Sequence, residues 1–171
     1  MPSPDKSLFY RALKLVSEIE EQWNKPFCSS ILYLRPIVFG SRGHIIPMPS
    51  NAYEFIVLCA PFIRPYKEEG QNLLVEMHYG RTAPNGVGVA KTAANYSHTH
   101  LPNSLINKDQ YDAILWLDAA THTYIEETSI ANIFVETDDG VFTPNLNGNI
   151  LAAYSTEDDH RQRLNMIAFS S

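Results

Sequence analysis

The sequence predicts a mixed α/β fold in two parts, and three observations support this. Apolar residues recur at helical spacing over 7–23. Runs rich in β-branched and aromatic residues, typical of short strands, lie on both sides of a charged stretch. That stretch, 61–70, contains two prolines and is the best candidate for a connection between the parts.

The first part is predicted to contain one helix and two strands. The helix over 7–23 should end where 24–26 brings an asparagine and a proline. Segment 29–39 is expected to be a strand at an edge or with a bulge, because Pro36 has no N–H to donate. A second strand is expected over 54–60, where nearly every residue is apolar.

The second part is predicted to be richer in strands. The turn residues 138–140 separate two short extended runs and predict a hairpin. From Thr156 onward, with acids in the first turn, we expect a final helix. The strands expected in this part are 73–79, 113–117, 123–128, 132–136 and 141–143.

Composition and charge exclude several classes of protein. The 171 residues carry 13 Lys+Arg against 19 Asp+Glu, and no basic cluster offsets the net charge of -6, so neither nucleic acid nor an anionic membrane is an expected partner. The longest apolar run, 55–63, contains a proline and is too short to cross a bilayer. With no visible secretory signal and no zinc motif around Cys28 and Cys59, we expect a cytoplasmic protein without a metal.

Lys91 is the first candidate for chemistry. It is the only formally charged residue in 82–107, and small apolar groups surround it. Partial desolvation would lower the pKa of its ammonium and favour the neutral amine that Schiff-base chemistry needs. The alternative is a lysine whose stem lies on apolar surface and whose head lies in water, and the spacing alone favours that alternative.

Glu127 is the second candidate. The two-residue period of a strand puts Glu127 on the face of Ile125, and Glu126 on the face of Tyr124. If Ile125 faces the core, Glu127 is an inward carboxylate that needs a partner. If Tyr124 faces inward, Glu127 is solvated, and the residues alone favour this second interpretation.

Two further motifs carry weaker signals. His98 and His100 lie two residues apart, but no third ligand cluster is near, so we expect both at the surface or in a loop. Gly86-x-Gly88 resembles part of a nucleotide-binding loop, but no helix is expected to follow it.

The segment around Lys91, GVGVAKTAANY, resembles the lysine segment of branched-chain aminotransferases, which are fold-type-IV enzymes that use pyridoxal 5'-phosphate. Other sequence blocks agree with the family in order and spacing, and their residues are most similar to those of fungal members. The resemblance runs from about Ser7 to Leu151. It favours functional roles for Lys91 and Glu127 over the solvated positions that the residues alone favour. The agreeing blocks are 32–40, 86–96, 111–118 and 124–134, followed by 145–151.

The resemblance implies a role for each matching residue. Lys91 would hold the cofactor in a Schiff base, and its freed amine would move the proton between the substrate Cα and the cofactor. Tyr96 would donate a hydrogen bond to the cofactor's phenolic oxygen, and Glu127 would pair with its protonated pyridine nitrogen. Arg81 would lie beside the cofactor. Ser155 lies where the family's phosphate turn is replaced, and its hydroxyl would still meet the phosphate at a helix N-terminus.

The resemblance also implies a substrate, an assembly and a domain organisation. Tyr33 and Arg35 would line the substrate pocket, where Arg35 suits the distal carboxylate of glutamate. The implied reaction transfers the amino group of leucine, isoleucine or valine to 2-oxoglutarate in a homodimer, in the cytoplasm or in mitochondria. Residues 1–64 would be the remainder of a small domain, 65–78 an interdomain linker, and 79–171 the opening part of a large cofactor-binding domain.

The chain departs from the family pattern at several positions. Ala93 and Ala94 replace two glycines, Ile130 replaces a threonine, and Pro102 interrupts a region where the family has a helix. The phosphate turn is replaced by 152–156, and we expect the chain to be truncated at both ends. Two alternatives follow: a catalytically impaired truncated paralogue or fragment, or a fungal secondary-metabolite transaminase with a different amino acid substrate.

Overall fold

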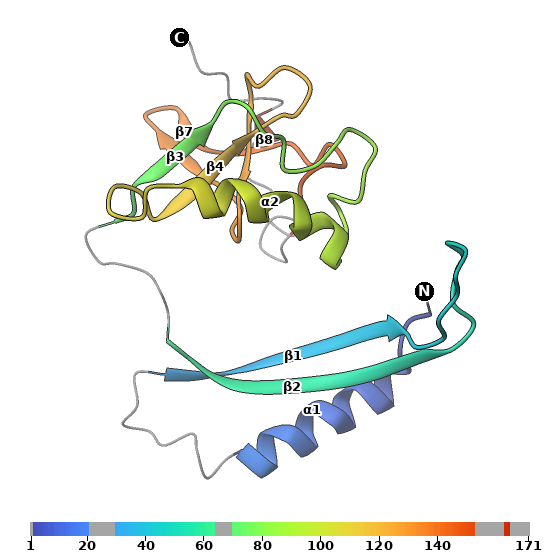
Figure 1. The fold of residues 1–171 in the computed structure, drawn as a ribbon. Helices are drawn as coiled ribbons and strands as arrows, with labels where there is room; N and C mark the ends of the chain where they lie inside the picture. The colour runs from blue at the N-terminus through green and yellow to red at the C-terminus, as the bar shows by residue number, and fades with distance from the viewer. Residues whose placement is uncertain (1, 21–29, 64–69, 153–162, 165–171) are drawn as a thin grey trace. The chain divides into compact units, whose positions relative to one another are not determined.

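The computed structural model describes residues 2–20, 30–63, 70–152 and 163–164 (Figure 1). The chain divides into two compact units, Met1–Tyr66 and Lys67–Ser171. In the ranges described, no helix is both long enough and apolar enough to cross a membrane.

In the first unit, helix α1 (Lys6–Glu20) packs against one face of a two-stranded sheet (Figure 1). The Asp5 carboxylate caps its start by accepting from the backbone N–H groups of Ser7 (2.9 Å) and Leu8 (3.2 Å). The half-buried side chains of α1 recur at helical spacing, and Phe9 stacks on Phe55 with ring centroids 5.9 Å apart. The predicted helix is therefore confirmed over the described residues.

The sheet of the first unit consists of β1 (Ser30–Gly40) and β2 (Tyr53–Ile63), which pair antiparallel. Strand β2 is longer than the predicted 54–60, because the ladder runs from the Gly40–Tyr53 pair to the Ser30–Ile63 pair, whereas β1 has the predicted length and begins and ends one residue later. Pro36 lies opposite Val57 within this ladder, and in a two-stranded sheet each strand is an edge, which confirms the position expected for this proline.

The central sheet of the second unit has the order β3–β4–β5. Strand β3 (Leu73–Glu76) is parallel to β4 (Ala113–Leu117), and β5 (Ile125–Thr128) is antiparallel to β4. The expected linker 65–78 therefore contains a strand, because all four residues of β3 pair with β4. The core gathers around Leu115, Leu117 and Ile125, with Leu73, Val75 and Ile133 packed against them.

Helix α2 (Ala93–Leu105) lies in the crossover between the parallel strands β3 and β4. Two sequence expectations are wrong here: a helix does follow the Gly86-x-Gly88 loop, and Pro102 does not interrupt it. Pro102 is buried in the last turn, where its fixed φ is compatible with a helix, and it cannot donate to the carbonyl of His98 four residues before it. Its own carbonyl still accepts from the N–H of Ile106 at 3.1 Å, which closes the final turn.

A second small sheet contains β6 (Val135–Thr137), β7 (Gly140–Pro144) and β8 (Arg163–Leu164). Strands β6 and β7 form the predicted hairpin, and Gly140 at its turn has a φ of 139°. Strand β8 pairs parallel with β7, so these two residues are extended and the expected final helix is wrong there. The rest of that expected helix lies outside the described residues.

Candidate active site

Three of the predicted cofactor residues come together in the second unit from three separate segments. Arg81 follows β3, Tyr96 lies in the first turn of α2, and Glu127 lies on β5. Arg81 Nη1 is 2.6 Å from Glu127 Oε1, and the two side chains are 2% and 5% exposed. The Arg81 guanidinium carbon is 5.8 Å from the centroid of the Tyr96 ring. Arg81 and Glu127 therefore form a buried ion pair, and the Tyr96 ring lies beside it.

The Glu127 carboxylate is held on both of its oxygens. The backbone N–H of Leu151 donates to Oε1 at 3.2 Å, and Asn132 Nδ2 donates to Oε2 at 3.4 Å. Burial raises the pKa of Glu127 to about 7, while the charge of Arg81 and the Leu151 hydrogen bond act in the opposite direction. Glu127 is buried and has Arg81 as its partner, which agrees with the expected inward carboxylate. The expected sharing of a face with Ile125 is not supported, because Ile125 pairs with Leu117 and Thr128 with Leu115, and this β-bulge interrupts the two-residue alternation.

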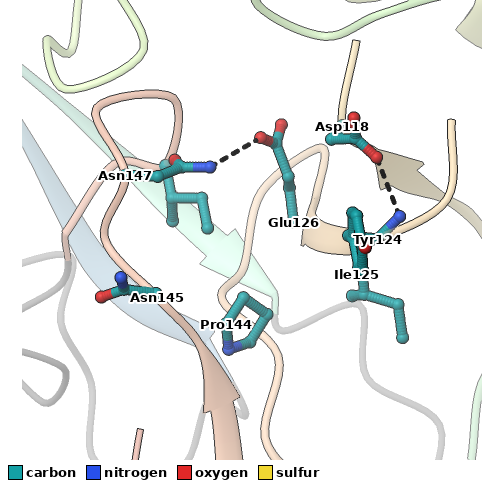
Figure 2. Close-up of a pocket in the computed structure, with 8 residues that line it drawn as sticks. Asp118, Tyr124, Ile125, Glu126, Pro144, Asn145 and Asn147 are labelled. Atoms are coloured by element: carbon teal, nitrogen blue, oxygen red, sulfur yellow. Dashed lines mark hydrogen bonds between the residues drawn. The ribbon is translucent and has the colours of Figure 1, made fainter. Parts of the chain in front are cut away.

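Glu126 is buried as well, and strand alternation does not predict this. Its Oε1 accepts from Nδ2 of Asn149 at 2.9 Å. The same oxygen accepts from Nδ2 of Asn147 at 3.3 Å (Figure 2). Burial raises the pKa of Glu126, and these two amide bonds oppose the shift. The second face of β5 is therefore covered by the segment that follows β7, which brings its own donors to the carboxylate.

The connection between β4 and β5 is organised by Asp118 (Figure 2). Its carboxylate accepts from the backbone N–H groups of Thr121 (2.7 Å), Thr123 (2.9 Å) and Tyr124 (2.8 Å). Partial burial opposes ionisation, but these bonds outweigh it and lower the pKa of Asp118 to about 2. The hollow drawn in Figure 2 is lined by Asp118, Tyr124, Ile125, Glu126, Pro144, Asn145, Asn147 and Ile150.

Lys91 lies immediately before Thr92, the N-cap of α2. Its side chain is exposed, so the expected partial desolvation is wrong for this chain. The physical reason is the size of its neighbours, because glycine and alanine side chains have too few atoms to cover a lysine. The loop is closed by backbone bonds from Ala90 to Val87 and from Thr92 to Ala90, each 2.9 Å long.

Sequence reasoning missed Asn95, whose side chain is buried beside the Lys91 loop. Its Nδ2 donates to the carbonyls of Gly88 and Ala90, each at 3.1 Å, and its Oδ1 accepts from Thr82 Oγ1 at 2.8 Å. An asparagine three residues after a threonine N-cap is a signal that could have been found, but only if the helix had been predicted. Asn95 connects the loop of Lys91 to the segment of Arg81.

Other predicted positions do not join this cluster. His98 and His100 are exposed, as expected, but they lie on α2, where residues two apart do not share a face. Ile130 is 72% exposed. No group of three or more metal-binding side chains occurs in the part of the chain that the structure describes. Ser155 lies outside that part.

Tyr33 and Arg35, the predicted substrate residues, share a face of β1 in the first unit. Arg35 Nη2 donates to the Tyr33 hydroxyl at 3.3 Å, and the guanidinium carbon lies 5.3 Å from the ring centroid. The Tyr33 ring also contacts Phe62 of β2, with centroids 5.6 Å apart. The tyrosine is thus fixed by packing, while the arginine is exposed.

The Nε–H of Arg81 tests whether the cluster fits a bound molecule. This atom is buried and has no hydrogen-bond partner among the described residues. A buried donor left unsatisfied costs about 1–3 kcal/mol. An acceptor oxygen on a molecule bound beside Tyr96 and Glu127 would satisfy it, so the residues present leave one donor and one carboxylate for a polar ligand.

Comparison with known sequences agrees with the resemblance. Residues 3–154 match the model of the family described as amino-transferase class IV. A Staphylococcus aureus (strain N315) protein named "Probable branched-chain-amino-acid aminotransferase" is 36% identical over 154 residues, which cover 88% of this chain and 43% of that protein. The chain thus spans less than half the length of this relative.

Comparison with solved structures identifies the fold. The branched-chain amino acid aminotransferase of Escherichia coli superimposes with a TM-score of 0.71 at 22% identity, over 92% of this chain and 51% of that one. The branched-chain aminotransferase of Thermoproteus uzoniensis, solved with norvaline, gives a TM-score of 0.64 at 22% identity, over 83% and 48%. The fold is that of the fold-type-IV aminotransferases, and the chain belongs to the amino-transferase class IV family.

Proposed function

We propose that the whole protein is a branched-chain amino acid aminotransferase that uses pyridoxal 5'-phosphate to transfer the amino group of leucine, isoleucine or valine to 2-oxoglutarate. The observation that carries this proposal is the buried ion pair between Arg81 and Glu127 beside Tyr96, in a chain of the class IV family. Each of these residues offers a group of the kind that the resemblance assigns to it.

Lys91 would supply the reacting amine. Pyridoxal phosphate, when bound, supplies an electron sink that stabilises negative charge at the substrate Cα. The exposed Nζ of Lys91 would bind the carbonyl carbon of the cofactor and, once released, would move a proton at the substrate Cα. This role requires an accessible side chain, because the amine must reach first the cofactor and then the substrate.

Glu127 would hold the proton on the pyridine nitrogen. Its carboxylate is already oriented by Asn132, by the N–H of Leu151 and by Arg81, so little rearrangement is needed when a cation arrives. The Tyr96 hydroxyl would donate to the phenolic oxygen, and the buried Nε–H of Arg81 would donate to a cofactor oxygen. Together these groups would orient the ring.

The remaining parts of the proposal concern substrate and organisation. Arg35, held next to Tyr33, would receive the distal carboxylate of glutamate or 2-oxoglutarate, because a guanidinium binds carboxylates with two parallel hydrogen bonds. Ser155 would contact the phosphate. The first unit would belong to the small domain and the second to the large cofactor-binding domain, in a cytoplasmic homodimer.

Reductive trapping tests this proposal. The protein is mixed with pyridoxal phosphate, reduced with borohydride and digested, and the modified lysine is identified by mass spectrometry. We expect the adduct on Lys91, and its loss in Lys91→Ala. An adduct spread evenly over Lys91 and exposed lysines such as Lys108 and Lys14 would overturn the assignment. Amino transfer from leucine, compared with other amino acids, separates this substrate class from that of a secondary-metabolite transaminase.

A further inference from the structure

Asn95 is the most completely bonded polar side chain of helix α2. It is 1% exposed, and its amide makes hydrogen bonds through both the nitrogen and the oxygen. The carbonyls of Gly88 and Ala90 can only accept, so the NH₂ group must face them and the oxygen must face Thr82. The orientation of the amide is therefore fixed by its partners.

These bonds act on the backbone that carries Lys91. The two carbonyls that Asn95 binds belong to Gly88 and Ala90, and Lys91 follows Ala90 directly. Because the Lys91 side chain is exposed, packing around the side chain does not decide where its amine projects. The backbone of the loop decides it, and Asn95 holds that backbone from one side.

The same loop also contacts Asn149. A Cβ added at Gly88 would overlap the backbone of Asn149, so the loop and this residue are in close contact. Asn149 in turn donates to Glu126 at 2.9 Å, and its carbonyl accepts from Arg81 Nη1 at 3.4 Å. Asn149 thus connects the loop to Glu126 and to Arg81, the guanidinium partner of Glu127.

Thr82 completes the connection. It is 4% exposed, donates to Asn95 Oδ1 at 2.8 Å, and follows Arg81 in the chain. A displacement of the Asn95 amide would therefore move both the loop of Lys91 and the backbone next to Arg81, whose guanidinium binds Glu127.

We propose that Asn95 is a positioning residue that fixes the Lys91 loop relative to the Arg81–Glu127 pair. Under the proposed function, on which this role rests, it sets the separation between the amine that binds the carbonyl carbon and the carboxylate that pairs with the ring nitrogen. Asn95 itself touches neither group, so its effect passes through the loop backbone and through Thr82.

Hydrogen exchange of the cofactor-free, full 171-residue chain directly tests whether the hydrogen bonds of Asn95 hold the Lys91 loop. In Asn95→Ala, the carbonyls of Gly88 and Ala90 lose the donor that holds the loop. We expect the backbone amides of 86–92 to exchange about tenfold faster than in the wild type, because the loop opens more often. Thr82→Val removes only the hydroxyl that orients the amide, so a smaller acceleration in the same peptide is expected. If Asn95→Ala does not fold, Thr82→Val carries the test alone.

Asn103→Ala is the matched control. Asn103 lies on the same helix, and its side chain donates to the carbonyl of Thr99 at 2.7 Å and to Ser129 Oγ at 3.5 Å. Its loss removes side-chain bonds from α2 without touching the loop, so exchange at 86–92 should stay within about twofold of the wild type. Equal acceleration by Asn95→Ala and Asn103→Ala, or none by Asn95→Ala and Thr82→Val, would overturn the proposal.

Trapping with pyridoxal phosphate and borohydride gives the second readout. We expect the share of adduct on Lys91, relative to Lys108, to fall about tenfold in Asn95→Ala and to be unchanged in Asn103→Ala. If the wild type itself is not modified on Lys91, the proposed function fails, while the exchange experiment still decides whether Asn95 holds the loop. Faster exchange with an unchanged share of adduct would overturn the positioning role.

Discussion

The loop of Lys91 and strand β5 present their functional groups in opposite ways. On β5, Glu126 and Glu127 are buried, and each receives donors from fixed neighbours. Lys91 is exposed, and Asn95 binds the backbone carbonyls of its loop rather than the lysine side chain. The difference teaches that an acceptor which stabilises charge is best surrounded before the ligand arrives, whereas a nucleophile needs access and freedom to move.

The largest expected effect on stability comes from removing the positive charge of Arg81, which pairs with Glu127 on β5. Arg81→Met leaves the buried Glu127 carboxylate without its partner at 2.6 Å, which should lower the free energy of unfolding by about 3–5 kcal/mol at pH 8. Urea unfolding measures this, with Arg42→Met as the exposed control. The loss should shrink at pH 5, where the unpaired carboxyl can be protonated. An equal loss at both pH values would contradict the account of the pair.

The pH dependence of stability tests the carboxylate side of the comparison. The folded pKa of Glu127, about 7, lies above its ordinary value of 4.5, so its contribution to stability is complete below pH 4.5 and is lost as the pH rises through 7. The free energy of unfolding should fall by about 2–3 kcal/mol over this window from this residue. Glu127→Gln should flatten the profile, and an unchanged slope would show that another group titrates there.

Gly88→Ala tests the loop side. The added methyl group would overlap the Asn149 backbone, so the loop must shift, at a cost of about 1–3 kcal/mol. We expect a matching fall in the share of pyridoxal phosphate trapped on Lys91. Gly43→Ala is the control, because a Cβ at Gly43 has nothing within 4 Å. Full retention of trapping in Gly88→Ala would mean that this contact does not position the loop.

A smaller effect is expected at the turn before β5. The hydrogen bonds of Asp118 lower its pKa from 3.8 to about 2, so its contribution to stability is present above pH 3.8 and is lost as the pH falls towards 2. Because solvent screens this partly exposed group, Asp118→Asn should cost about 1–2 kcal/mol at pH 7. Asp139→Asn, at the exposed hairpin turn, should cost less. Equal costs, measured by thermal unfolding, would contradict the assigned bonds.

Local pattern was enough to predict much of the fold. The apolar segment AILWL predicts β4 with its observed bounds, because a short buried strand has no competing helical period. The turn residues before Val141 predict the β6–β7 hairpin, since their backbone preferences are local. An inward Glu127 that needs a partner is also predicted, although a β-bulge between Ile125 and Thr128 interrupts the alternation on which that prediction rests.

What could not be predicted depends on contacts between distant segments. The burial of Glu126 requires the 147–149 segment, which supplies amide donors from 21 and 23 residues away in the chain. Asn95 can bind the Lys91 loop only because it lies on helix α2, which contains Pro102. On propensity alone, a proline in that position argues against a helix. The exposure of Lys91 follows from the small size of its neighbours, whereas the sequence prediction considered only their low polarity.

The central claim is that the buried carboxylate of Glu127 and the exposed amine of Lys91 form one cofactor site, and matched variants of the two neighbouring glutamates test it most directly. Trapping on Lys91 is measured over a range of pyridoxal phosphate concentrations in Glu127→Gln and in Glu126→Gln. Charge-assisted hydrogen bonds contribute about 1.5–3 kcal/mol, so Glu127→Gln should raise the half-saturating concentration about tenfold to hundredfold. Glu126→Gln keeps an oxygen that can accept from Asn149 and should change it by less than about threefold. Equal shifts in the two variants, or no shift in Glu127→Gln, would contradict the claim.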